Sequence, residues 1–184
     1  MMPHANQKFL ALQGGTGTER EVSLRSGANV AASLRMAIAQ AVGCRDVKDE
    51  NFIAPPGFYP AFNMVHGTLG EDGRLQENLD AQDACYTGEG TSGNRLGFDK
   101  VVSKQRFTEN GVNSTPAYEV LNTDAKPTLS LPFVVKKAPR QGSSVGVYLC
   151  STPEEAIVAL CEVSQFGEDV LVDQLVSGRG IVCS

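Results

Sequence analysis

The N-terminal segment carries a strand pattern, a glycine-rich turn and a helical pattern, and this order constrains the fold more than any other feature. Residues 8–13 form a short apolar run that predicts a buried strand. Residues 14–18, Gly-Gly-Thr-Gly-Thr, end that strand. A helix is predicted over residues 20–40 from apolar positions at approximately helical spacing, which are Val22, Leu24, Val30, Leu34 and Ala37. A strand, a glycine-rich turn and a helix open a doubly wound α/β unit, in which ligands bind at the carboxyl ends of the strands. The glycines do not have the G-x-G-x-x-G spacing of a dinucleotide site.

A second polar loop follows the strand that is predicted at residues 61–65. This loop, residues 66–73, has the sequence His-Gly-Thr-Leu-Gly-Glu-Asp-Gly. In a parallel sheet it lies at the same edge as the first turn, so His66 is a candidate for ligand contact as well as for a structural role. Glu19 begins the first helix, where a carboxylate either complements the helix dipole or faces a ligand. Both interpretations stay open for each residue.

A third segment reads as a hairpin with cations at its base. An apolar run over residues 131–135 ends in Lys136 and Lys137, and residues 140–146, Arg-Gln-Gly-Ser-Ser-Val-Gly, then precede a β-type run over residues 147–149. Glycines let a backbone approach a ligand, and successive amide groups at such a tip can wrap a phosphate. A neighbouring lysine adds a positive charge. An ordinary hairpin with a polar tip is the alternative.

Composition narrows the class of protein. The chain has 184 residues, a net charge of −5, 41% hydrophobic and 20% charged residues, which is typical of a globular protein and argues against a nucleic-acid partner. No apolar run is long enough for a membrane span, and the N-terminus has no signal-peptide core. The cysteines are widely spaced and odd in number, which indicates reduced thiols and a cytoplasmic location: Cys44, Cys85, Cys150, Cys161 and Cys183.

Turn-forming residues at 86–93 divide the chain into two predicted domains, residues 1–93 and residues 94–184. In the second domain the patterns predict helices at residues 95–110 and from a capped start at residue 153 to about 165, and a strand over residues 169–176. Residues 181–184 read as the start of another strand. Because such a strand start buries little surface, we expect the chain to be cut or an adjoining segment to be supplied elsewhere.

Four segments together resemble a known family. Residues 14–24, 66–76, 99–100 and 141–146 stand in the order, and with the residues, of D-alanine–D-alanine ligases of the ATP-grasp superfamily. The resemblance covers the whole chain but only the N-terminal and central portion of such a ligase. It implies an α/β fold with a doubly wound parallel-sheet (pre-ATP-grasp) domain, followed by an α+β ATP-grasp lobe that stops before the C-terminal lobe.

The family's activity is what the resemblance implies for this chain. ATP phosphorylates the carboxylate of one D-alanine, and the amine of a second D-alanine attacks the acyl phosphate to give D-alanyl-D-alanine for peptidoglycan synthesis. ATP, D-alanine and Mg²⁺ are the implied ligands, and the implied assembly is a homodimer through the N-terminal domain in the cytoplasm. The metal ligands are expected beyond residue 184, so the chain by itself is expected to be inactive.

The resemblance also assigns residues. Glu19 holds the ammonium of the first D-alanine, Ser143 hydrogen-bonds to Glu19, and His66 lines the same subsite. A lysine after residues 131–132 contacts the phosphates: counting forward favours Lys136, whereas counting back from the loop favours Lys137, to which we give preference. The full set of implied ATP-binding residues is Lys100, Lys136, Lys137, Gly142, Ser143, Ser144, Val145, Gly146, Asp173, Gln174 and Val176.

The chain departs from the family at the adenine strand. The family has Glu-Lys where this chain has Asp173 and Gln174, and the later ribose-binding glutamate falls at Gly180. These departures favour a second hypothesis, a catalytically dead nucleotide- or amino-acid-binding remnant of the family. Intact Glu19, His66 and Ser143 favour the ligase, and a plain flavodoxin-like domain with coincidental loops is a third alternative.

Overall fold

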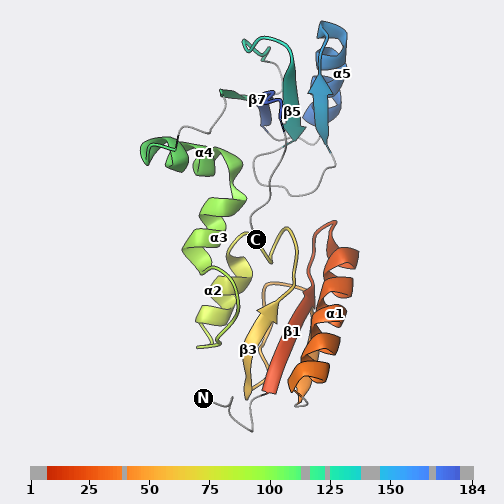
Figure 1. The fold of residues 1–184 in the computed structure, drawn as a ribbon, viewed down its shortest axis with the longest axis vertical. Helices are drawn as coiled ribbons and strands as arrows, with labels where there is room; N and C mark the ends of the chain where they lie inside the picture. Colours follow the sequence, from red (N-terminus) through yellow and green to blue (C-terminus); the bar gives the residue numbers. More distant parts are fainter. Residues whose placement is uncertain are drawn as a thin grey trace. The chain divides into compact units, whose positions relative to one another are not determined.

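The computed structural model describes residues 8–38, 41–112, 117–122, 125–137, 146–165 and 169–178. The chain divides into two compact units, residues 1–98 and residues 99–184, each with a sheet of its own (Figure 1). The sheet of the first unit is parallel and that of the second is antiparallel. The predicted mixed α/β class is therefore confirmed.

The first unit is built around a central strand. β1 (Lys8–Gly14) lies between β2 (Val42–Val47) and β3 (Phe58–Asn63), and both neighbours run parallel to it. The helices of the unit are α1 (Arg20–Ile38), α2 (Arg74–Asp80) and α3 (Thr91–Phe98). Because all three strands run the same way, the turn after β1 and the loop after β3 end up at one edge of the sheet.

The two faces of β1 are covered differently. One face contributes Leu10 and Leu12 to a core that also contains Leu75 and Leu79 of α2. The other face lies under α1, where Gly27 lets the helix come close: a Cβ on Gly27 would lie 2.5 Å from Cβ of Gln13. Small side chains therefore set the distance between α1 and the sheet.

The buried stripe of α1 differs from the predicted one. Ser23, Gly27 and Ala31 are buried at intervals of four residues, whereas Val22, which the sequence pattern places on the apolar side, is 45% exposed. The prediction for Val22 was wrong because it placed the hydrophobic residues of the helix against the sheet. Close packing of α1 on β1 instead requires small residues at the contact.

The helix predicted over residues 95–110 is two helices. α3 ends at Phe98, and α4 (Lys100–Glu109) begins after Asp99, which has an extended backbone. The side chain of Asp99 accepts hydrogen bonds from the amides of Val101 and Val102 and so caps α4. The domain boundary that is predicted between residues 93 and 94 lies inside α3.

The second unit has the strand order β4-β7-β5-β6. Its further elements are β4 (Tyr118–Leu121), β5 (Phe133–Lys137), β6 (Val147–Cys150), α5 (Pro153–Ser164) and β7 (Val170–Gln174). Thr152 and Glu155 form a capping box at the start of α5, where the sequence predicts a capped helix. Helix α5 covers one face of the sheet, and the apolar cluster there includes Phe133, Val135, Val172, Ala159 and Val163.

None of the helices in the described ranges is long and apolar enough to cross a membrane. The longest of them, α1 with 19 residues, carries charged side chains along its length.

Candidate functional site

Two glycine-rich loops meet at the carboxyl edge of the first sheet. A Cβ on Gly17 would lie 3.6 Å from the amide nitrogen of Thr68, so the turn after β1 touches the loop after β3. Glu19 immediately precedes α1 at the end of this turn, and a Cβ on Gly67 would lie only 2.6 Å from Oε2 of Glu19. The Glu19 carboxylate therefore rests against the backbone of Gly67, whose φ of +65° also favours glycine.

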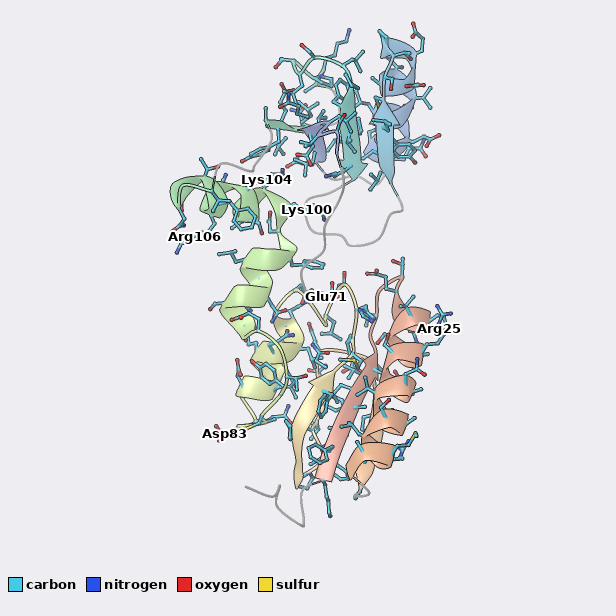
Figure 2. All side chains as sticks on the ribbon, viewed as in Figure 1. Arg25, Glu71, Asp83, Lys100, Lys104 and Arg106 are labelled. Carbon is cyan, nitrogen blue, oxygen red and sulfur yellow. The ribbon has the colours of Figure 1, made fainter. Side chains whose placement is uncertain are left out.

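Each ring nitrogen of His66 lies near a polar side chain, and the two contacts orient the ring. Its Nε2 lies 3.2 Å from Oγ of Ser26 on α1, and its Nδ1 lies 3.4 Å from Oε1 of Glu71 in the same loop (Glu71 is labelled in Figure 2). The side chain of His66 is 35% exposed, so the ring is fixed but reachable. The structure thus brings Glu19, Gly67 and His66 to one place at the sheet edge, as the sequence predicts for the two loops.

Ser23 stabilises the carboxyl edge of the first sheet, and the sequence prediction gave it no role. Its Oγ accepts a hydrogen bond from the amide of Gly14 at 2.8 Å and donates one to the carbonyl of Met64 at 2.6 Å. One buried hydroxyl thus joins α1 to the ends of β1 and β3. The signal was present, because Glu19, Ser23 and Ser26 are spaced by four and three residues and share a helix face.

Arg20 and Asp46 form a second support that the sequence did not reveal. Nη1 and Nη2 of Arg20 donate to the two carboxylate oxygens of Asp46 at 2.9 and 2.6 Å, and Nη1 also donates to the carbonyl of Gly15 at 3.1 Å. The hydrogen bonds from Arg20 hold the pKa of Asp46 below its usual value, against the opposing effect of burial. No sequence signal points to this pair, because it depends on the parallel register of β1 and β2.

In the second unit, charged groups gather on the sheet face opposite α5. Nζ of Lys136 lies 2.6 Å from Oδ2 of Asp173, and Nζ of Lys104 lies 3.2 Å from Oδ1 of the same carboxylate (Lys104 is labelled on α4 in Figure 2). The Asp173 side chain is only 5% exposed. No described residue donates a hydrogen bond to its Oδ1, since the contact with Lys104 lies outside hydrogen-bonding geometry. Asp173 and Lys136 are predicted site residues that come together, whereas Lys104 had no predicted role.

The other predicted ATP-binding residues are placed as follows. Lys100 is the first residue of α4 and is half-buried, Gln174 is exposed at the end of β7, and Val176 is 70% exposed after it. Gly146 is buried with a φ of +77°. The backbone of Lys137 pairs with Val170, but its side chain lies outside the described part. Gly142, Ser143, Ser144 and Val145 also lie outside it, so the expected contact between Ser143 and Glu19 stays a prediction.

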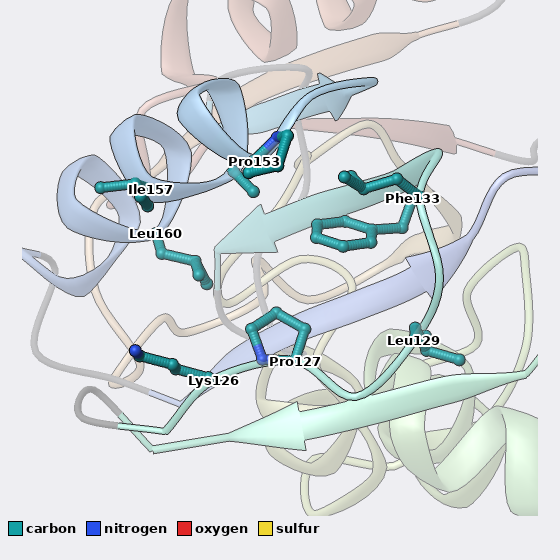
Figure 3. Close-up of a pocket in the computed structure, with 9 residues that line it drawn as sticks. Lys126, Pro127, Leu129, Phe133, Pro153, Ile157 and Leu160 are labelled. Carbon is teal, nitrogen blue, oxygen red and sulfur yellow. The ribbon is translucent and has the colours of Figure 1, made fainter.

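A metal-binding group and an apolar pocket are two further kinds of site that the described residues could form. Within the described ranges no group of three or more His, Cys, Asp or Glu residues could hold a metal ion. A pocket of about 410 Å³ lies between α5 and the segment before β5, and Figure 3 shows its lining of Pro, Leu, Phe and Ile side chains beside Lys126. This pocket contains none of the predicted site residues.

Comparison with known proteins gives one family throughout. The sequence model for the D-ala D-ala ligase C-terminus matches residues 100–184. The D-alanine–D-alanine ligase of Bordetella avium is 37% identical over 181 residues, which is 94% of this chain and 56% of the relative. That of Alcanivorax borkumensis is 39% identical over 173 residues, or 93% of this chain and 54% of the relative. The chain thus spans a little over half the length of these curated relatives.

Solved structures agree with this assignment. The D-alanyl-alanine synthetase A from Vibrio cholerae superposes with a TM-score of 0.75 at 26% identity, covering 95% of this chain and 60% of that one. The Bacillus anthracis ligase complexed with ATP gives a TM-score of 0.80 at 24% identity, covering 94% and 58% respectively, and at that identity supports the fold alone. These matches show that the chain is similar to D-alanine–D-alanine ligases over nearly its whole length and corresponds to a little over half of a member of that family.

Proposed function

We propose that this protein ligates two D-alanines to D-alanyl-D-alanine with consumption of ATP, as a precursor for peptidoglycan in the cytoplasm. The single observation that carries the proposal is the Glu19 carboxylate resting against Gly67, next to the oriented ring of His66. An acid at this position can hold the ammonium of the first D-alanine through a charge-assisted hydrogen bond. The family's homodimer through the N-terminal unit is part of the same proposal.

The proposed reaction has two steps. A carboxylate oxygen of the first D-alanine attacks the γ-phosphorus of ATP, the bond to the β-phosphate oxygen breaks, and ADP leaves. The amine of the second D-alanine attacks the acyl carbon, loses a proton and expels inorganic phosphate. Both steps bring anions together or develop charge, so cations and oriented amides are the groups that lower the barrier.

For the nucleotide we propose Lys136 as the phosphate-binding lysine of the strand. Lys136 shares its sheet face with Asp173, and its ammonium lies 2.6 Å from Oδ2 of that carboxylate. Lys100, Gln174, Val176 and the predicted loop over residues 142–146 complete the proposed ATP site. Mg²⁺ would supply charge neutralisation at the phosphates when bound, but the described residues hold no ligand set for it.

A catalytically dead binding remnant is the second candidate. Asp173 and Gln174 replace the family's Glu-Lys, and the Asp173 carboxylate is engaged with two lysines of its own chain. A remnant of this kind would bind nucleotide or amino acid without joining two D-alanines.

Titration of the 184-residue chain with D-alanine, L-alanine and ATP by calorimetry tests the proposal. We expect binding of ATP and preference for D-alanine over L-alanine, and no dipeptide release by this chain alone. Binding of ATP without either alanine would support the remnant, and binding of none of the three would contradict both. Release of dipeptide by the 184-residue chain would refute its expected inactivity.

A further inference from the structure

Among the described residues, the charged cluster around Lys136 contains two lysines and one carboxylate, that of Asp173. Asp173 faces two ammonium groups that come from different elements, Lys136 from β5 and Lys104 from α4. A carboxylate that is only 5% exposed requires compensation, because leaving it unpaired in the interior is strongly unfavourable. With two lysines present, one can be withdrawn without leaving the carboxylate unpaired.

We infer that Lys104 is a positioning residue that carries the counter-charge of Asp173 and so releases Lys136 to bind a phosphate group of the nucleotide. The inference rests on the proposed function and extends it to a residue that needs no contact with ATP. Without Lys104, a phosphate would compete directly with Asp173 for the Lys136 ammonium.

Lys104 and Lys136 differ in exposure and in their neighbouring groups, as their two proposed roles require. The Lys104 side chain is 15% exposed, and its ammonium lies 5.3 Å from the centre of the Tyr118 ring, which adds a cation–π contact. The Lys136 side chain is 29% exposed, so solvent and ligands reach it more easily. Lys104 is therefore the more enclosed partner and Lys136 the more accessible one, although Lys136 makes the shorter contact with Asp173, 2.6 Å against 3.2 Å.

The strand register places Asp173 and Lys136 on one face of the sheet, together with the Tyr118 ring that Lys104 contacts. Asp173 pairs with Tyr118 on one side and with Val134 on the other, and Lys136 lies two residues along from Val134. Side chains two residues apart share a sheet face, so Tyr118, Asp173 and Lys136 lie on one face. The buried cluster beneath α5 occupies the other face.

The first test needs no ligand. The rate at which Lys136 of the intact 184-residue chain is acetylated by an activated ester is measured by peptide mass mapping. We expect Lys104→Met to slow acetylation of Lys136 severalfold, because Asp173 then depends on Lys136 alone. In an Asp173→Asn background the same Lys104→Met change is expected to have no effect.

The second test measures ATP affinity. Lys104→Met is expected to weaken ATP binding by about tenfold, a factor typical of coupled neighbouring charges, while adenosine binds as before. Lys104→Arg keeps the charge and is expected to retain affinity for ATP, and this variant also serves if Lys104→Met fails to fold. In the Asp173→Asn background, Lys104→Met is expected to leave ATP affinity unchanged.

The outcomes separate this inference from the proposed function. If the wild-type chain binds no ATP but acetylation of Lys136 depends on Lys104 only when Asp173 is present, the charge division holds and the nucleotide site fails. If Lys104→Met changes acetylation equally with and without Asp173, the inference is overturned. Equal losses of ATP and adenosine affinity in Lys104→Met would likewise overturn it, since they indicate a merely structural role.

Discussion

The guanidinium of Arg20 holds the carboxylate of Asp46 through two hydrogen bonds, Nη1 to Oδ1 at 2.9 Å and Nη2 to Oδ2 at 2.6 Å. This pair joins the first residue of α1 to β2. It also reaches the carbonyl of Gly15 in the turn that leads to Glu19. The carboxyl edge of the first sheet is thus fixed by a charged clamp beside the proposed D-alanine subsite.

The clamp predicts a pH-dependent contribution of Asp46 to stability. Because Arg20 lowers the pKa of Asp46 in the folded protein, the contribution is present above the unfolded pKa, which is about 3.9, and is lost as pH falls through the folded value. We expect Asp46→Asn to unfold in less urea than the wild type at pH 7, and the difference to shrink by pH 3. The matched control is Asp169→Asn, at an exposed position before β7. A difference that is the same at both pH values would contradict the clamp.

A glycine at the same edge makes a steric prediction. Gly14 has a φ of +96°, and a Cβ there would lie 2.0 Å from Oδ1 of Asp46. Gly57 has a φ of +80° with nothing within 4 Å of such a Cβ. Both alanine variants carry the left-handed backbone cost of about 1–2 kcal/mol, but Gly14→Ala also displaces the clamp. Urea unfolding should therefore show the larger loss for Gly14→Ala, and equal losses would mean that the clamp moves aside freely.

Glu19 is predicted to act on the amino acid and not on the nucleotide. Glu19→Gln removes the charged partner of the D-alanine ammonium, so calorimetry should show D-alanine binding weakened by about 1.5–3 kcal/mol with ATP binding unchanged. Glu21→Gln, at an exposed position on the same helix, is the control and should change neither affinity. If both ligands lose affinity equally in Glu19→Gln, Glu19 serves only as a charge at the helix terminus.

The two adjacent lysines of β5 give a direct comparison. Lys136→Met should weaken ATP binding by about 1.5–3 kcal/mol, because it removes the ammonium on the Asp173 face. Lys137→Met should have little effect, since neighbouring strand residues point to opposite faces. Fluorescence titration with ATP measures both variants. The opposite ranking would restore the preference for Lys137 that follows from counting back from the loop.

Much of the fold could be predicted from local patterns. The apolar run over residues 8–13, the glycine turn and the helix after it have period and turn signals that depend on near neighbours only. The break at Asp99 was not predicted, although Gly97 is a poor helix former and Asp is a favoured N-cap residue. The capping role of Asp99 appears only once its backbone is extended. The small-residue stripe of α1 likewise reflects the approach of β1, which no single helix reveals.

The candidate site was predictable where it lies in one short segment. Glu19 and His66 follow a turn and a strand that the sequence marks, and the loops that carry them do meet. For the phosphate-binding lysine the sequence favours Lys137 over Lys136, and this choice stays a prediction. Lys104 and Asp46 were missed because each pairs with a residue of another element far along the chain, through the packing of a helix against a strand. A residue that acts through another one leaves no local pattern.

The cap at Asp99 has a practical consequence for dissecting the chain. Helix α4 carries its own starting signal, since the carboxylate that binds the amides of Val101 and Val102 belongs to the first residue of the second unit. A recombinant fragment that begins at Asp99 keeps this signal, whereas one that begins at Lys100 loses it and starts with two bare amides. The choice of a single codon therefore decides whether the isolated second half can form its first helix as the intact chain does.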